Sequence, residues 1–246
     1  MPNQKGGQKS DQIFGESFKG TSVSADDASQ LAEKLAADVA QWLQRGVEQR
    51  GNATLVVSGG STPAPFFNSL SQQAIDWSNV TVTLADERWV EPNDDISNEK
   101  LVRETLLINA ASAAKFTSLF AGTGTPQDGW SVCQQALQSM SRPFDVVVLG
   151  MGGDGHTASL FPNTSGLSDA CDLNTDKLCW PMHPVHLEEA RMTLTLKALL
   201  DCRELVLHFT GEDKRDVFSS ALRGEDLPIG TVAKAASSKL QVYWAA

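Results

Sequence analysis

Two side chains that could carry out acid–base chemistry, Asp154 and His156, lie two residues apart in a glycine-rich segment. An imidazole exchanges protons near neutral pH, and a carboxylate beside it can orient the ring or bind a hydroxyl group. Four glycines occupy positions 150, 152, 153 and 155, where they allow tight turns and a close approach of a ligand to the backbone. This composition is typical of a loop that serves acid–base catalysis.

The loop follows Asp145 to Leu149, an apolar-rich run that predicts a buried strand of a parallel sheet. Parallel α/β sheets bind ligands at the carboxyl ends of their strands, which is where this loop must lie. Two other interpretations remain open. The first is that the loop merely caps a following helix. The glycines at 150, 152 and 155 also match a G-x-G-x-x-G dinucleotide motif, but residues 157–176 contain prolines and polar turns where that motif requires a helix and a strand.

Residues 58–63, Ser-Gly-Gly-Ser-Thr-Pro, form a second glycine segment after a predicted strand over residues 53–57. Proline suits the first turn of a helix, so a helix is expected to begin there and to run to about Leu70. The backbone of Gly59 and Gly60 and the hydroxyls of Ser61 and Thr62 would supply donors at its positive end. The segment therefore predicts a phosphate-binding loop, although it lacks the G-K-[ST] ending of a Walker loop and a plain tight turn is the alternative.

Charged residues follow other predicted strands. Asp86 and Arg88 come directly after a strand over 80–84, and Lys214 lies one turn into a helix after a strand over 204–209. Burying such charges is costly unless they pair or bind a ligand. The alternative for Lys214 is a solvated position on the helix surface.

Three possible metal ligands, Cys179, His183 and His186, lie in one short proline-containing segment. Their spacing matches no standard zinc pattern, and the sequence offers no evident fourth ligand. No metal site is therefore expected.

The organisation of the chain predicts one main domain. Residues 1–24 are a polar N-terminal segment, in which residues 1–12, rich in Gly, Gln, Lys and Ser, are expected to be disordered. From residue 25 to 246, helical and strand patterns alternate without a linker or an internal repeat. This alternation predicts a single three-layer α/β domain with a mostly parallel sheet.

The composition narrows the classes of partner. The chain has 246 residues, 20 basic and 30 acidic, with a formal charge of −10, which argues against nucleic acid or an anionic membrane surface as a partner. A few local basic residues could still bind a small anion. No apolar run approaches the length of a membrane span, and the four cysteines form no C-x-x-C pair, so a reduced, cytoplasmic protein is expected.

Six segments resemble motifs of the 6-phosphogluconolactonase family and occur in the same order as in that family. The resemblance extends from about residue 25 to the end of the chain. The segments are Ser58–Pro63, Asp86–Arg88, Ser97–Asn98, Leu149–Pro162, Arg191–Thr195 and Thr210–Lys214. The resemblance implies the Rossmann-like fold shared with glucosamine-6-phosphate deaminase, ribose-5-phosphate isomerase and coenzyme A transferases. It also implies hydrolysis of 6-phospho-D-glucono-1,5-lactone to 6-phosphogluconate in the oxidative pentose phosphate pathway, without a metal or an organic cofactor.

The resemblance and the chemistry together suggest a role for each candidate residue. His156 is the expected general base, Asp154 would orient it or bind substrate hydroxyls, and Arg88 would face the anionic or oxyanionic part of the substrate. The expected residues of the substrate and phosphate site are Gly59, Gly60, Ser61, Thr62, Asp86, Arg191 and Lys214.

Two rival functions are compatible with parts of the sequence. Amino-sugar phosphate deaminases resemble the chain in their glycine loops, but they carry Glu five residues after the loop histidine, where this chain has Phe161. They also carry Asp-Glu-Tyr at the position of Asp86–Arg88, where the third residue of this chain is Arg. A non-catalytic sugar-phosphate sensor would need neither His156 nor Asp154. The lactonase interpretation is therefore preferred, with a small sugar phosphate as the partner and a monomer or weak homo-oligomer as the expected state.

Overall fold

The fold is built on a seven-stranded parallel sheet. In the computed structural model, which describes residues 14–246 except 16, 123 and 186, the strand order is β1-β10-β9-β6-β2-β3-β5, and each neighbouring pair is parallel. The bounds are β1 Thr21–Ala25, β2 Ala53–Val57, β3 Val80–Leu84, β5 Lys115–Thr117, β6 Phe144–Leu149, β9 Cys202–Thr210 and β10 Leu240–Ala245. The inner strands β2 and β6 are buried along their whole length, as their Val- and Leu-rich runs predict.

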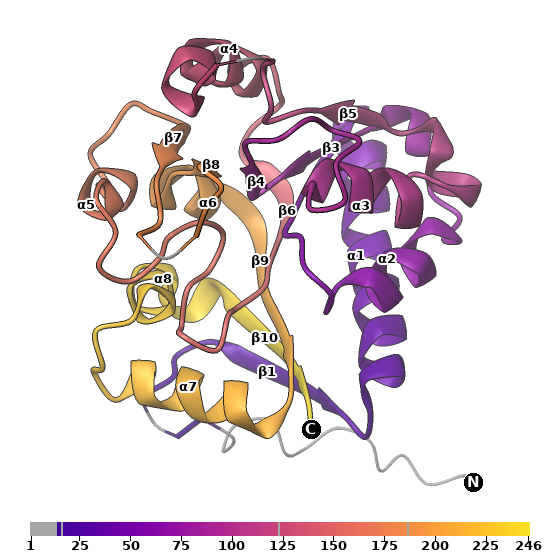
Figure 1. Cartoon of the computed structure of the whole chain (residues 1–246). Coiled ribbons are helices and arrows are strands. Elements are labelled where there is room, and N and C mark those ends of the chain that lie inside the picture. The colour runs from indigo at the N-terminus through magenta and orange to yellow at the C-terminus, as the bar shows by residue number, and fades with distance from the viewer. Residues whose placement is uncertain (1–13, 16, 123, 186) are drawn as a thin grey trace, which may run out of the picture.

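Helices cover both faces of this sheet (Figure 1). On one side lie α1, α2 and α3, and on the other lie α7 and α8. The helices are α1 Ala28–Arg50, α2 Ala64–Ser71, α3 Asn98–Thr105, α4 Pro126–Gln138, α5 Leu167–Ala170, α6 Leu196–Leu200, α7 Glu212–Leu222 and α8 Pro228–Ala236. The predicted three-layer α/β fold is confirmed. Among the described helices, none is long and apolar enough to cross a membrane.

The limits of α1 follow from its sequence. The side chain of Asp27 accepts a hydrogen bond from the backbone N–H of Gln30 at 2.9 Å and so caps the first turn. The helix ends at Gly51, which adopts φ 76° and donates its N–H to the carbonyl of Val47. Glycine takes this left-handed conformation without strain, so the chain can turn at once into β2.

A separate three-stranded antiparallel sheet, which the sequence patterns did not predict, carries several of the candidate site residues. Its order is β4-β8-β7, with β4 Asp86–Arg88, β8 Arg191–Leu194 and β7 Cys179–Met182. Only Ala85 separates β3 from β4. Its N–H donates to the carbonyl of Val57 and its carbonyl accepts from Leu194, both at 2.8 Å. Ala85 therefore joins the two sheets.

Three further elements, β1, α8 and the short helix α5, were not predicted from the sequence. Most of β1 falls within the segment 1–24, yet it pairs with β10 along the edge of the main sheet. Phe14 in the same segment packs edge-on against Phe218 of α7, with ring centroids 5.0 Å apart. The expected disorder of residues 1–12 lies outside the described residues.

A buried carboxylate joins the amino ends of β2 and β6. Asp145 accepts the backbone N–H of Thr54 at 2.8 Å and its hydroxyl at 3.3 Å. The same carboxylate pairs with Arg50 of α1 and lies 3.4 Å from Nε of Arg203. Because these donors are partly shielded from water, the carboxylate stabilises the register of the two central strands.

Asp145→Ala is expected to lower the free energy of unfolding by about 2–3 kcal/mol, because it leaves the Thr54 N–H without its acceptor and Arg50 without its partner. Urea denaturation of both proteins measures this difference. Asp176→Ala is the matched control, since this exposed carboxylate pairs only with Lys177 in the described structure and its loss should cost less than about 1 kcal/mol. Equal effects of the two substitutions would contradict the anchoring role of Asp145.

Candidate active site

The candidate site is a pocket at the point where the strand order of the main sheet reverses. From β2 the chain moves outward to β3 and β5, and then returns to the other side of β2 to form β6, β9 and β10. Loops at the carboxyl ends of such strands diverge and leave a crevice. The pocket there has a volume of about 220 Å³. It is lined by residues 58–63, Phe67, Asp86, Arg88, Asn98, residues 148–152, His156, Ala158, Arg191, His208 and Lys214.

The loop after β2 forms one wall of the pocket and leads into α2. Gly60 has φ 93°, which favours glycine, and α2 has no side-chain cap at its N-terminus. A Cβ atom on Gly59 would meet the side-chain oxygen of Asn98 at 1.8 Å, so only glycine allows α3 to pack so closely against this loop. The open N-terminus of α2 can therefore bind an anion through its backbone N–H groups.

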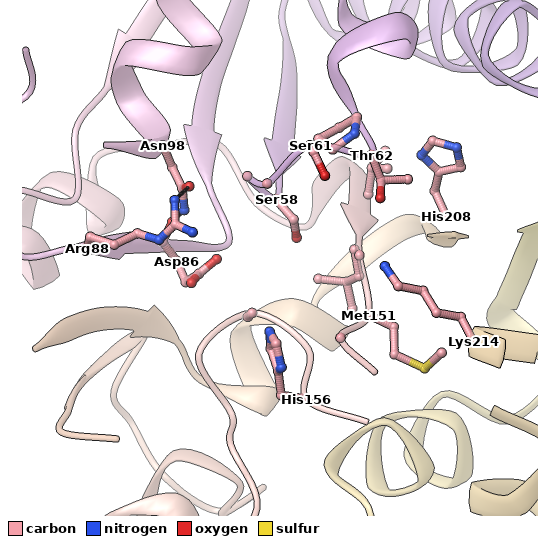
Figure 2. Close-up of a pocket in the computed structure, with 18 of the residues that line it drawn as sticks. Ser58, Ser61, Thr62, Asp86, Arg88, Asn98, Met151, His156, His208 and Lys214 are labelled. Carbon is pink, nitrogen blue, oxygen red and sulfur yellow. Dashed lines mark hydrogen bonds between the residues drawn. The ribbon is translucent and has the colours of Figure 1, made fainter. Parts of the chain in front are cut away.

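Lys214, in the first turn of α7, reaches into the pocket from the opposite layer (Figure 2). Burial lowers the pKa of its ammonium group from the ordinary value. Among the described residues it has no hydrogen-bond or salt-bridge partner, in contrast to Arg215 beside it, which pairs with Glu212 and Asp216. The Lys214 charge is thus available to a ligand, because the partly buried side chain lines the pocket.

Asp154 and His156 are in direct contact. Oδ1 of Asp154 lies 2.5 Å from Nδ1 of His156 and also accepts the backbone N–H of His156 at 3.1 Å. Partial burial would raise the pKa of Asp154, but the hydrogen bonds and charge of His156 outweigh it and lower that pKa. Because Asp154 holds Nδ1, the other ring nitrogen of His156 is left to accept a proton in the pocket.

The glycines and Phe161 fix the position of this histidine. A Cβ atom on Gly152 would meet the His156 ring at 2.2 Å, and Gly155 adopts φ 76°. The ring of Phe161 stacks on that of His156, with centroids 4.2 Å apart and an interplanar angle of 29°. The guanidinium of Arg191 lies over the same phenyl ring, at 5.5 Å from its centroid. The imidazole therefore has little freedom to rotate.

Asp86, Arg88 and Arg191 come together across the small antiparallel sheet, where Arg88 and Arg191 occupy paired positions of β4 and β8. Nη1 of Arg191 lies 3.9 Å from Oδ2 of Asp86, which also accepts the Ser159 hydroxyl at 2.5 Å. Arg191 is 7% exposed, and burial lowers the pKa of its guanidinium, although Asp86 opposes this effect. Two cations and one carboxylate thus line one side of the pocket.

Glu87, which was not predicted as a site residue, holds this side of the pocket together. It is 1% exposed, and its two oxygens accept the backbone N–H groups of Arg88, Asn98 and Glu99 at 2.7, 2.8 and 2.7 Å. The Ser97 hydroxyl donates to it at 3.1 Å. Glu87 therefore caps α3 from the neighbouring strand β4.

The capping of α3 positions Asn98 inside the pocket. Its Nδ2 donates to the carbonyl of Asp86 at 2.9 Å, and its Oδ1 accepts from Nη1 of Arg88. That guanidinium also donates to the carbonyl of Ile96 at 2.8 Å. The Ser97–Asn98 pair was noted in the sequence, but only the fold shows that Asn98 fixes the direction of Arg88.

Of the ten predicted site residues, nine line this pocket and the tenth, Asp154, contacts His156 from outside it. Ser58, Asn98, Met151 and His208 also line the pocket and were not predicted as site residues. Ser58 could have been found from its place in the glycine segment. His208 carries no such signal, because it reads as one residue of an apolar strand.

The three possible metal ligands do not form a centre in the part of the chain that is described. Cys179 is buried in β7, and His183 is exposed, with its Nε2 at 2.6 Å from the Gln127 amide nitrogen. His186 lies outside the described residues. No group of three His, Cys, Asp or Glu side chains suited to a metal ion occurs among those described.

Comparison with known proteins identifies the class to which this fold and site belong. The family model for glucosamine-6-phosphate isomerases/6-phosphogluconolactonase matches residues 26–244. The chain belongs to this family.

Three individual relatives of the chain all carry one of the two activities named in the family description, that of 6-phosphogluconolactonase. The chain is 44% identical over 223 residues to a 6-phosphogluconolactonase of Rhizobium meliloti, covering 89% of this chain and 96% of that protein. It is 38% identical over 220 residues to a 6-phosphogluconolactonase of Pseudomonas aeruginosa, covering 88% and 91%. The crystal structure of a 6-phosphogluconolactonase from Shewanella baltica superposes with a TM-score of 0.88 at 46% identity, covering 92% of this chain and 97% of that one.

A pH-dependent stability follows from the burial of Glu87. Burial raises the pKa of Glu87 to about 7, although the hydrogen bonds from Asn98, Glu99 and Arg88 oppose the rise. The folded protein therefore keeps a proton that the unfolded chain loses at lower pH, and its stability falls as the pH rises through this interval. Relative to Glu87→Gln, which cannot ionise, the wild-type free energy of unfolding should fall by about 2–3 kcal/mol between about pH 5 and pH 8.

Urea denaturation of both proteins at each pH measures this change. The Gln variant loses an acceptor and should be the less stable protein at low pH, so only the change in the difference with pH is diagnostic. A difference that stays constant over the whole interval would show that Glu87 does not take up a proton on folding.

Proposed function

We propose that this chain hydrolyses 6-phospho-D-glucono-1,5-lactone to 6-phospho-D-gluconate, as a 6-phosphogluconolactonase of the oxidative pentose phosphate pathway. The observation that carries the proposal is one pocket in which an oriented histidine, His156, lies together with an open helix N-terminus and Lys214, a cation without a partner in the described part of the chain. The first can activate water, and the other two can hold a phosphate. The similarity to 6-phosphogluconolactonases over most of the chain supports this assignment.

The phosphate is assigned to the N-terminus of α2 and the cations that line the pocket. The backbone of Gly59 and Gly60 and the hydroxyls of Ser61 and Thr62 would donate to its oxygens, and Lys214 and Arg191 would balance its charge. This local concentration of donors explains how a chain with a formal charge of −10 could bind an acidic substrate. Asp86, which faces the same pocket, would accept hydrogen bonds from sugar hydroxyls.

The chemical step is assigned to His156. Its free ring nitrogen takes a proton from a water molecule, whose oxygen attacks the lactone carbonyl, while Asp154 stabilises the imidazolium that forms. Arg88, held by Asn98, would stabilise the oxyanion of the tetrahedral intermediate. Collapse of this intermediate breaks the bond to the ring oxygen, and the proton held by His156 is then available to the departing oxygen.

The deaminase alternative lacks its acid at the required place. The position five residues after His156 holds Phe161, whose ring stacks on the imidazole. A carboxyl group there would be needed for a ring-opening relay, and a phenyl ring cannot transfer a proton. The geometry therefore favours the lactonase.

The proposed oligomeric state and cellular location of the protein follow from two further features. All of the assigned residues come from a single chain, so a monomer or a weak homo-oligomer is sufficient for activity. The four cysteines are free, which is consistent with the proposed cytoplasmic location.

His156→Asn tests the general base. An amide of similar shape can donate and accept hydrogen bonds but cannot take up the proton of water, so kcat should fall by about 10²–10⁴ with a much smaller change in KM. Hydrolysis of freshly prepared lactone is measured, and the spontaneous rate is subtracted at each pH. His183→Asn is the control, because that exposed histidine lies outside the pocket. A folded His156→Asn protein that retains more than about a tenth of wild-type kcat would remove His156 from this role.

Lys214→Ala tests the phosphate site. Loss of one charge-assisted contact should raise KM by about ten- to a hundredfold and weaken the preference over unphosphorylated gluconolactone. Arg215→Ala is the matched control on the same helix and should leave KM unchanged. Arg191→Ala should also raise KM, with an added loss of stability, because Asp86 loses its buried partner. A Lys214→Ala protein with wild-type KM and reduced turnover alone would contradict the assignment.

A further inference from the structure

Unpaired buried polar atoms are concentrated in the pocket. Four side-chain atoms in the described part of the chain are buried without a hydrogen-bond partner: Ser58 Oγ, Arg88 Nε, Arg191 Nε and His208 Nε2. All four belong to residues that line the pocket. Proteins rarely leave such groups unsatisfied, so this concentration indicates a polar ligand. Arg88 and Arg191 already have roles in the proposed function, whereas His208 has none.

His208 lies on β9 beside the proposed phosphate position. It is 3% exposed, its ring packs edge-on against Phe66 of α2 at 6.1 Å between centroids, and it lines the pocket with Lys214 and Thr62 (Figure 2). An apolar side chain would suit this environment at least as well if packing were the only requirement. The polar ring, whose Nε2 has no hydrogen-bond partner among the described residues, therefore suggests a contact with a ligand.

The charge of the ring follows from its surroundings. Burial, with a contribution from the positive charge of Lys214, lowers the pKa of His208 to about 4. The ring is therefore uncharged near neutral pH, with one N–H donor and one acceptor nitrogen. Lys214 remains the cation of this side of the pocket, and His208 can add a neutral donor without repelling it.

We infer that His208 is a specificity-determining residue that donates an imidazole N–H to an oxygen of the substrate phosphate, between Lys214 and the N-terminus of α2. The inference rests on the proposed function in taking a sugar phosphate as the ligand. It adds a contact that distinguishes a phosphate from a hydroxymethyl group, since the donor would be left unpaired by an unphosphorylated lactone.

Three variants test this inference. His208→Leu removes the donor and keeps an apolar side chain of similar size, and His208→Gln keeps an amide N–H. His183→Leu is the matched control outside the pocket. For each variant, kcat and KM are measured with the phosphorylated and the unphosphorylated lactone. Calorimetry gives Kd for 6-phospho-D-gluconate and for inorganic phosphate, and thermal unfolding verifies the fold.

In His208→Leu, the ratio of kcat/KM for the phosphorylated lactone to that for the unphosphorylated lactone should fall by about tenfold or more, chiefly through KM. The Kd values for 6-phospho-D-gluconate and inorganic phosphate should rise by a similar factor. His208→Gln should recover part of each loss, and His183→Leu should change none of them. If His208→Leu does not fold, an intermediate loss of phosphate affinity in the folded Gln variant supports the inference, and wild-type affinity in that variant contradicts it.

Two results would overturn the inference. Unchanged phosphate binding in a folded His208→Leu protein would assign the residue to packing, and a loss confined to 6-phospho-D-gluconate, without inorganic phosphate, would assign the ring to a sugar hydroxyl. Failure of the proposed function has a different signature. A wild-type protein that does not hydrolyse the lactone, yet binds these phosphates in a manner dependent on His208, would contradict the lactonase activity and retain the role of His208.

Discussion

The parallel pairing of β2 with β6 is the constraint on which the site depends. The two strands are neighbours in the sheet although about 90 residues separate them in the chain, with Leu55, Val56 and Val57 in register with Val146, Val147 and Val148. This register brings the two glycine loops to the same edge of the sheet, where the strand order reverses. Asp145 supports the register from the other end of the strands. The two glycine loops face one pocket because a single ladder of hydrogen bonds aligns the strands that precede them.

The second constraint is the placement of charge inside the protein. Charged groups are costly to bury. Those around this pocket either have a specific partner or, like Lys214, are able to bind a ligand. Glu87 receives hydrogen bonds from α3, and Asp86 lies beside Arg191, whereas Lys214 has no partner among the described residues. Buried capping of α3 by Glu87 also positions Asn98, and Asn98 directs Arg88. One side of the pocket is thus rigid before a substrate binds, and this rigidity lowers the cost of ordering the site in the transition state.

Much of the site could be predicted from the sequence because its residues occur in short segments whose composition by itself indicates a turn, a helix start or a strand. Glycine at 59, 60, 152 and 155, Pro63 at a helix start and apolar runs such as 145–149 each indicate a backbone shape by themselves. By contrast, the small antiparallel sheet pairs β4 with β8, which lies about 100 residues further along the chain, and no local pattern indicates such a pairing. Glu87 and His208 were missed for the same reason, since the groups around each of them belong to other elements of the fold.

The sequence by itself determined the class of fold, the order of the loops and the residue types available for catalysis, because periodicity and turn chemistry act over a few residues. Only the tertiary structure decided which of these residues share a pocket. It brought Asp154 within 2.5 Å of His156, stacked Phe161 on the same ring and left Lys214 without a partner among the described residues. It also placed His208, an unremarkable residue of a buried strand, beside Lys214. The places of Lys214 and His208 depend on contacts between segments far apart in the chain, which are set by how the layers pack. The contacts of Asp154 and Phe161 with His156 lie within one loop and depend on the conformation of that loop.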